Sequence, residues 1–466
     1  MNRLAPLSVP AFRRFWAGRV LSVTGTAMAP VALAFAVLRL GGSAADLSFV
    51  LMANVGAQVL FLLFGGALAD RVPRSRVLIF ANVAAGCVQG TVAAVVLSGS
   101  ARVFELVLLA FLGGTANAFI TPAAQGTVAR LVPAALRRDA NALLRMAFNV
   151  FKVAGPAIAG VVVATIGPGW AIAWDAATFF GAALIMTGLP AEEVTARAQK
   201  FTAGLAEGVR EFWARPWLRI VVAQSAVGVL GWLVGFQLLG PVYALRSHGG
   251  AVAWGEISAG FAVGLLTGSL GAFLWRPQRV GVVMAAGSAC MAVPLIAMAA
   301  AAPTWVVVLG TATAGIGTDM SILAWSTYRQ LAIPDELLAR MNAVNGLVQL
   351  LPIPLGYAVA GPLADAFGVA PVLCAAAALT LASATMPLAS REVRAMRLGT
   401  FDEPESDGSK SNEPKSNAPK RPAIAIAAST QTATRYRRGP HPRSPRSGAT
   451  DTGTCSGGCE PPRPRR

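Results

Sequence analysis

The sequence predicts an all-α polytopic membrane protein with twelve transmembrane helices, because of its composition, its long apolar runs and the alternation of its basic loops. Of the 466 residues, 55% are hydrophobic and 13% are charged, and the mean hydropathy is +0.58. A soluble domain carries roughly a quarter of its residues as charged ones. The composition therefore excludes an ordinary soluble protein.

Twelve apolar runs are long enough to cross a bilayer, which requires about 20 mainly apolar residues in a helix that satisfies its own backbone. The first six fall at 16–39, 46–69, 77–98, 103–126, 140–165 and 170–190. The other six fall at 218–243, 252–275, 280–301, 304–327, 338–362 and 369–389. The segment before the first run is polar and basic, and the run itself is too long for a signal peptide, so we expect no cleaved leader.

Basic residues gather in every second loop. One set of loops carries Arg71, Arg74, Arg76, Arg130, Arg137, Arg138, Arg197, Lys200, Arg210, Arg276, Arg279, Arg329 and Arg340. The opposite set holds little more than Arg39, Arg102 and Arg246. The positive-inside rule therefore predicts a cell-membrane protein with both termini in the cytoplasm. The net charge of +17 reports this topology, and we expect no nucleic-acid partner.

Composition divides the chain into four parts. We predict an N-terminal six-helix bundle at 1–190, a cytoplasmic linker with an amphipathic helix at 191–216, a C-terminal six-helix bundle at 217–390, and a tail at 391–466. The linker mixes acidic and basic residues with Phe201, Phe212 and Trp213, a pattern typical of a helix on the membrane surface. The tail is rich in Pro, Ser, Lys and Arg, which predicts a disordered basic segment.

The two halves resemble each other at a constant offset of 201 residues. The matched pairs are Pro133 and Pro334, Asn141 and Asn342, Gly155 and Gly356, Gly160 and Gly361, and Gly167 and Gly368. Spans five and eleven are therefore predicted to be equivalent, with small residues that let helix backbones approach closely. Six-helix repeats around a central site are one architecture of secondary transporters.

A motif between spans two and three carries a family resemblance. The segment 66–76 reads GALADRVPRSR, which resembles the G-x-L-A-D-R-x-G-R-K signature of the major facilitator superfamily at Gly66, Leu68, Asp70, Arg71 and Arg74. It departs from that signature where Pro73 replaces a glycine. The resemblance implies that Gly66, Asp70, Arg71 and Arg74 gate the cytoplasmic side. The alternative is that the arginines only anchor the topology.

Span five carries a second motif at 154–160, AGPAIAG, which is similar to the glycine-proline motif of drug/proton antiporters at Gly155, Pro156 and Gly160. Residues 13–390 resemble exporters of the enterobactin and macrolide-efflux type. The sequence departs from those families in two places. Residues 104–126 hold no arginine, and Thr26 follows Gly25 where related exporters often carry an Asp.

Several ionisable residues fall at membrane depth, where each costs on the order of 2.5–3.5 kcal/mol on insertion scales. Arg145, Asn149 and Lys152 share one face of span five. Lys152 lies about 20 Å from the cytoplasmic end of its span and Asp175 about 8 Å from the outer end of the next, so we predict that the two pair. Asp319 has no predicted partner at its depth. A coupling role for either acid competes with a structural hydrogen bond.

Neutral polar residues inside the spans could line a cavity, or could equally bond neighbouring helices. They are Asn54, Gln58, Asn117, Asn149, Gln237, Asn345 and Gln349.

The resemblance implies a secondary active transporter that exports amphiphilic small molecules (drugs, antibiotics or siderophore-like compounds) and is driven by the proton gradient, and we expect it to be a monomer. The sequence contains no nucleotide-binding loop, catalytic triad or metal-ligand set, so we expect no cofactor, no metal and no enzymatic activity. Two alternatives remain open. The first is an importer of the same fold, and the second is a membrane sensor or scaffold that does not transport.

Overall fold

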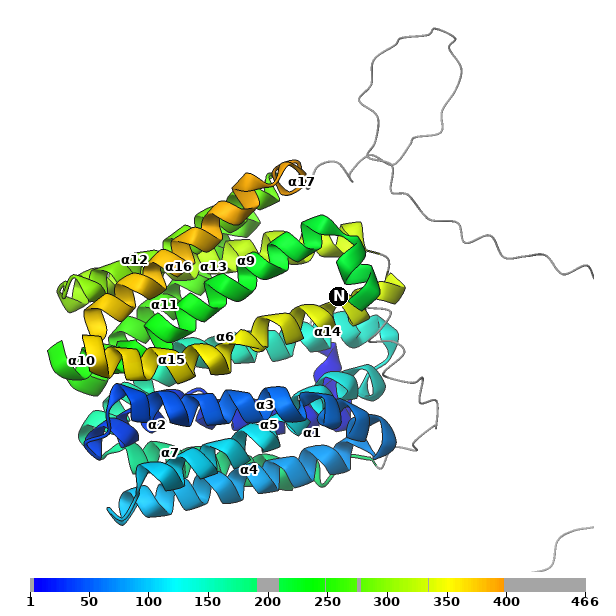
Figure 1. Cartoon of the computed structure of the whole chain (residues 1–466). Helices are drawn as coiled ribbons and strands as arrows, with labels where there is room; N and C mark the ends of the chain where they lie inside the picture. Colours follow the sequence, from blue (N-terminus) through cyan, green and yellow to red (C-terminus); the bar gives the residue numbers. More distant parts are fainter. Residues whose placement is uncertain (1–3, 191–208, 248, 275–277, 334, 398–466) are drawn as a thin grey trace, which may run out of the picture. The chain divides into compact units, whose positions relative to one another are not determined.

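The computed structural model describes residues 4–190, 209–247, 249–274, 278–333 and 335–397, and the fold in these ranges is helical (Figure 1). Twelve of its helices or broken helices are long and apolar enough to cross a membrane. They form two bundles of six, which confirms the predicted fold class. The tail from residue 398 and most of the predicted linker helix lie outside the described residues, although residues 209–214 are helical.

The N-terminal bundle is built from six spans and two short 3-10 turns. Its helices are α1 (Pro10–Thr26), α2 (Ala29–Arg39), α3 (Ala44–Arg71), α4 (Arg74–Leu97), α5 (Val103–Leu131), α6 (Arg137–Thr165) and α7 (Pro168–Met186). The turns are Ala5–Ser8 and Ala134–Leu136.

The C-terminal bundle repeats the pattern. Its helices are α9 (Pro216–Trp232), the π-helix η3 (Leu233–Leu238), α10 (Leu239–Ser247), α11 (Gly250–Leu274), α12 (Val280–Ala299), α13 (Thr304–Ala332), α14 (Asp335–Leu350), α15 (Pro352–Phe367), α16 (Val369–Ala389) and the short α17 (Arg391–Arg394).

Three spans are broken, each at or near a proline. Span one consists of α1 and α2, and it breaks just before Pro30. Span seven contains the π-helix ahead of Pro241, and span eleven restarts as α15 at Pro352. A proline inside a helix removes a backbone hydrogen bond and clashes with the preceding turn, which explains these breaks.

The buried apolar side chains divide the molecule into two ends. We call the end with the arginine-rich loops the basic end (to the right in Figure 1) and the other the opposite end. At the opposite end, one core cluster contains residues of both bundles, from Val31, Phe35 and Leu47 to Leu239 and Tyr357. At the basic end, the N-terminal bundle and the C-terminal bundle each have a cluster of their own. Among the described residues, the bundles therefore share a core at the opposite end and not at the basic end.

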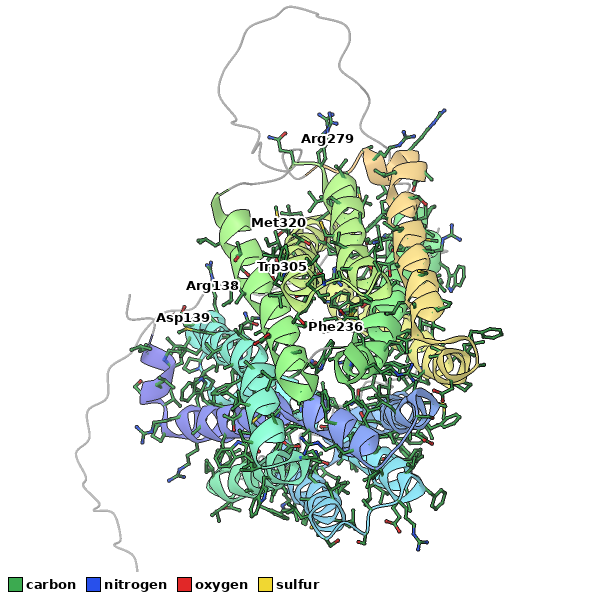
Figure 2. All side chains as sticks on the ribbon, turned by 90° about the vertical axis from the view of Figure 1, so that its left-hand side faces the viewer. Arg138, Asp139, Phe236, Arg279, Trp305 and Met320 are labelled. Atoms are coloured by element: carbon green, nitrogen blue, oxygen red, sulfur yellow. The ribbon has the colours of Figure 1, made fainter. Side chains whose placement is uncertain are left out.

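Figure 2 views the molecule from the opposite end. The labelled Phe236 belongs to the shared core together with Trp232 and Trp254. Its ring stacks on Trp232 at a centroid distance of 4.3 Å and lies 4.7 Å from Trp254. This aromatic group fills the C-terminal side of the junction beside the break in span seven.

The glycines matched by the 201-residue offset occupy equivalent contacts. Gly155 packs against Ala27 in span one, and Gly356 packs against Leu230 in span seven. Gly167 and Gly368 have φ angles of 103° and 92°, a backbone region that favours glycine. Both precede the last span of their bundle. The sequence repeat therefore corresponds to a repeat of helix contacts.

Candidate functional site

Asp175 lies at the junction of three helices in the N-terminal bundle and is 1% exposed. Gln89 of α4 donates from Nε2 to its Oδ2 at 2.5 Å, and the Thr26 hydroxyl at the end of α1 lies 3.4 Å from Oδ1. A Cβ on Gly25 would lie 2.6 Å from Oδ1, so the glycine lets α1 approach the carboxyl. Asp175 is thus held by neutral polar groups.

The predicted Lys152–Asp175 pair is wrong for this structure. Asp175 faces α1 and α4, while Lys152 is exposed on α6 and forms no ion pair with it. Helix counting placed both residues at a common depth, but depth alone does not determine which way a helix is rotated. The packing of Gly25 and Gln89 against α7 turns Asp175 into the bundle.

Asp319 on α13 has partners that the sequence did not predict. The hydroxyl of Ser269 on α11 donates to Oδ2 at 2.6 Å, and the charge of Lys152 on α6 acts on the carboxylate without forming a direct ion pair. Lys152 belongs to the N-terminal bundle and Asp319 to the C-terminal one. The two side chains therefore belong to different bundles and form no direct ion pair.

Two helix pairs close the opposite end. α6 packs against α11, and α3 packs against α15. A Cβ on Gly160 would lie 2.6 Å from the carbonyl oxygen of Ala251, and a Cβ on Gly361 would lie 2.8 Å from that of Ala44. Gly160 and Gly361 are matched by the sequence repeat. Both closures therefore depend on a glycine whose missing side chain lets the backbone of the other bundle approach closely.

A carboxylate reinforces the α3–α15 closure. Asp365 of α15 accepts hydrogen bonds from the backbone N–H groups of Ala44 at 3.1 Å and Ala45 at 3.0 Å, both in the first turn of α3. The first N–H groups of a helix have no partner within the helix, and the helix dipole favours an anion there. Asp365 of the C-terminal bundle therefore caps a helix of the N-terminal bundle.

The sequence analysis missed Asp365, Gln89 and Ser269. A signal for Asp365 was present: the pattern G-x-L-A-D occurs at 66–70 and again at 361–365, in both cases where a span ends. The only hint of Gln89 is an amide inside an otherwise apolar span. Nothing in the sequence indicated that Ser269 would meet Asp319, because the two residues lie on different helices.

We predict that Asp365→Asn raises the population in which the opposite end is open, because asparagine has one acceptor oxygen where aspartate offers two to the N–H groups of Ala44 and Ala45. The expected shift is about 1 kcal/mol, or about fivefold in the population that is open there. A cysteine at Ser48, which is fully buried against Gly361, would report it through its rate of maleimide labelling. Asp46→Asn is the matched control, because Asp46 caps the same helix from within the N-terminal bundle. Equal labelling of Asp365→Asn and the parent protein would contradict a capping role.

The predicted gating motif falls on the end of α3 and the start of α4. The side chains of Asp70 and Arg71 lie outside the described part of the chain, so their gating role stays a prediction. Arg74 begins α4, and its guanidinium lies against the backbone of Gly126 in α5. Because Gly126 has no side chain, there is room for the guanidinium. Arg74 therefore connects α4 to α5 within the N-terminal bundle.

Of the predicted cavity-lining residues, four form side-chain hydrogen bonds with other described residues and three do not. Asn54 donates to the carbonyl oxygen of Ala110 at 3.1 Å, which is a helix–helix bond within one bundle. Gln349 donates to Asn345 at 3.1 Å, and Gln237 accepts from Tyr357 at 3.3 Å. No side-chain hydrogen bond to another described residue is found for Gln58, Asn117 and Asn149, of which Asn149 is exposed.

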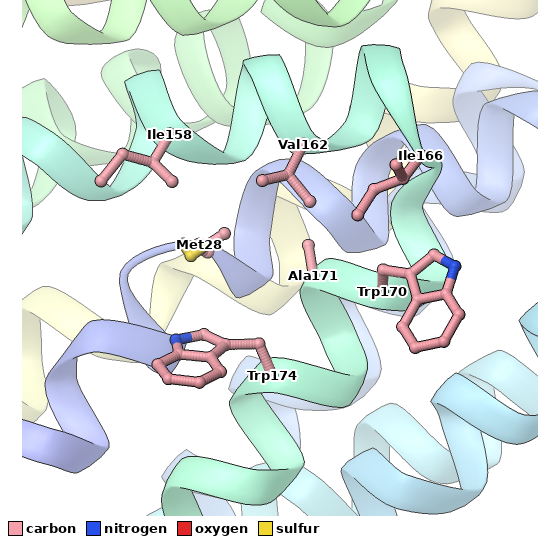
Figure 3. A pocket seen from close by; sticks show the side chains of 7 residues that line it. All are labelled: Met28, Ile158, Val162, Ile166, Trp170, Ala171 and Trp174. Carbon is pink, nitrogen blue, oxygen red and sulfur yellow. The ribbon is translucent and has the colours of Figure 1, made fainter.

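An apolar pocket of about 310 Å³ lies where α6, α7 and the break in span one meet (Figure 3). Its lining is Met28, Ile158, Val162, Ile166, Trp170, Ala171 and Trp174. Trp174 precedes the buried Asp175 in the chain, so the pocket and the carboxyl lie on neighbouring positions of α7. The lining is suited to a hydrocarbon group.

Comparison with known proteins gives the class that the sequence predicts, a membrane transporter. A family model described as transmembrane secretion effector matches residues 1–418. The multidrug efflux pump Tap of Mycolicibacterium fortuitum is 26% identical over 381 residues, covering 79% of this chain and 91% of that protein. The enterobactin exporter EntS of Salmonella typhimurium is 27% identical over 354 residues, covering 72% and 81%.

Solved structures share the fold at low identity. The nucleoside transporter NupG has a TM-score of 0.63 at 14% identity, covering 82% of this chain and 98% of that one. A bacterial homologue of the human lysosomal transporter Spinster, in an inward-facing and unoccupied conformation, has a TM-score of 0.59 at 16% identity, covering 84% and 97%. These likenesses show the arrangement of the helices alone.

Proposed function

Because this chain belongs to the transmembrane secretion effector family of major facilitator transporters, we propose that it is a proton-driven exporter of amphiphilic small molecules. Membership of the family makes it a multi-pass membrane transporter. Export, the proton as coupling ion and the amphiphilic substrate are the parts that we propose.

The observation that carries the proposal is the distribution of the buried core. Alternating access requires one end of the two bundles to be closed while the other is separated, and then the reverse. Here the bundles share a core at the opposite end and have separate cores at the basic end. This is the arrangement of one half of such a cycle.

The basic end is proposed to face the cytoplasm, because arginines in short loops are retained on that side. The structure then corresponds to an inward-facing state, in which a substrate enters from the cytoplasm. The closures at Gly160 and Gly361 would separate when the substrate leaves on the outer side. A multidrug efflux pump and an enterobactin exporter among the relatives support this direction.

Asp175 is proposed to carry the proton. The Thr26 hydroxyl lies 2.9 Å from the carbonyl oxygen of Ser22 and 3.4 Å from Asp175 Oδ1, but it has only one proton to donate. If that proton goes to Ser22, only a protonated Asp175 can complete the second contact. The site therefore accommodates the neutral acid, and its neutral partners leave the carboxyl free to exchange a proton during the cycle.

The experiment that tests the function uses everted membrane vesicles that contain the full chain. We expect them to accumulate a fluorescent amphiphilic dye when the lumen is acidified, and to lose the dye when a protonophore collapses the gradient. Vesicles from cells without the protein provide the background. Accumulation that ignores the gradient would contradict proton coupling, and gradient-driven uptake by right-side-out vesicles alone would indicate an importer.

A further inference from the structure

One face of α6 runs from the opposite end, where the bundles are closed, to the basic end, where they are separated. Gly160, Pro156, Lys152, Asn149 and Arg145 lie within about 80° of one another at 3.6 residues per turn. At the closed end this face contacts the other bundle, since a Cβ on Gly255 of α11 would lie 3.2 Å from both the Cα of Gly160 and the carbonyl oxygen of Pro156. The same face must therefore point toward the C-terminal bundle along its whole length.

Toward the basic end this face carries charge. Arg145, Asn149 and Lys152 are exposed there, because the two bundles no longer share a core. No hydrogen bond or ion pair joins the side chain of Arg145 or Lys152 to any described residue. Two cations thus project from the N-terminal bundle, at membrane depth, into the region between the bundles.

The facing surface of the C-terminal bundle does not neutralise them. Ser269 lies on α11 within about 40° of Gly255 and donates to Asp319, which is half-buried against α11. Asp319 forms no direct ion pair with Lys152. Arg19 of α1 lies over the ring of Phe148, with 5.4 Å between its guanidinium carbon and the ring centroid. Among the described residues, no acid forms an ion pair with Arg145 or Lys152, and Asp319 is bonded to Ser269 instead.

We propose that Arg145 and Lys152 bind the acidic group of the transported molecule, so that the substrate is an amphiphilic organic anion. The proposal rests on the proposed function and adds the charge of the substrate to it. A guanidinium binds a carboxylate or sulfonate through two parallel N–H···O bonds, and Lys152 adds a second, mobile charge. Asn149, one helical turn from Arg145 on the same face, supplies a neutral donor.

The test compares two xanthene dyes of similar size and opposite charge, fluorescein and rhodamine 123. Binding to the purified full-length protein in dodecyl maltoside micelles is followed by fluorescence anisotropy. We expect fluorescein to bind at least about tenfold more tightly, the equivalent of one charge-assisted hydrogen bond. Arg145→Gln and Lys152→Gln should each weaken fluorescein binding by about tenfold. Arg145→Lys should retain part of it.

Arg246→Gln is the matched control, because Arg246 is an exposed arginine at the closed end and its loss makes the same change in net charge. It should leave fluorescein binding unchanged. Tighter binding of rhodamine 123, equal binding of both dyes, binding of neither, or an equal effect of Arg246→Gln would overturn the proposal. The assay needs no gradient and no transport, so its result is independent of whether the vesicles export.

Discussion

Replacing Asp175 with Asn should reduce gradient-driven dye accumulation in everted vesicles to the level of vesicles without the protein. Asparagine has the shape of aspartate and keeps an oxygen that can accept from Gln89. It cannot gain or lose a proton, so a transporter that couples through this carboxyl loses its driving force. The fold should survive, at a cost of about 1 kcal/mol for the weaker hydrogen bond.

Substrate counterflow separates a loss of coupling from a loss of the site. Exchange of labelled for unlabelled dye needs alternating access but no net proton movement, so Asp175→Asn should still catalyse it. Asp139→Asn is the matched control, because Asp139 is in the first turn of α6 at the basic end. Full gradient-driven uptake by Asp175→Asn, together with its loss in Asp319→Asn, would assign the proton to Asp319 instead.

Replacing Gly160 with Val should prevent the opposite end from closing. The added Cβ would meet the carbonyl oxygen of Ala251 at 2.6 Å and the Cα of Gly255 at 3.0 Å, and both are backbone atoms that cannot rotate away. Overpacking of this kind costs about 1–3 kcal/mol, which favours the state open at the opposite end by roughly tenfold to a hundredfold. Transport should fall because the cycle stalls in that state.

The cysteine at Ser48 reports this change too, after the native cysteines have been replaced. We expect maleimide labelling to be slow in the parent protein and much faster in Gly160→Val, with the same elution on size exclusion. Gly271→Val is the matched control: it makes the same substitution on α11 at a glycine whose Cβ would meet nothing within 4 Å. Slow labelling together with normal transport by Gly160→Val would show that close backbone approach at this point is not required.

Much of the fold could be predicted from the sequence, because membrane insertion depends on local properties. Each span is an apolar run of sufficient length, and no partner elsewhere in the chain is needed to identify it. The G-x-L-A-D-R motif, read with the twelve spans, was enough to suggest the superfamily. The repeat also predicted equivalent glycines, and Gly160 and Gly361 indeed occupy equivalent contacts between the bundles.

The site depends on relations that a linear pattern does not contain. Asp175 meets Gln89 and Thr26, residues from three different spans, and Asp365 meets the first turn of a helix more than 300 positions away. The rotation of each helix about its axis decides these contacts, and close packing at glycines sets that rotation. The sequence by itself determined the spans, the gathering of the basic loops at one end and the resemblance to a family. Only the tertiary structure decided which polar groups meet, because their partners are brought together by packing between helices and not by spacing along the chain.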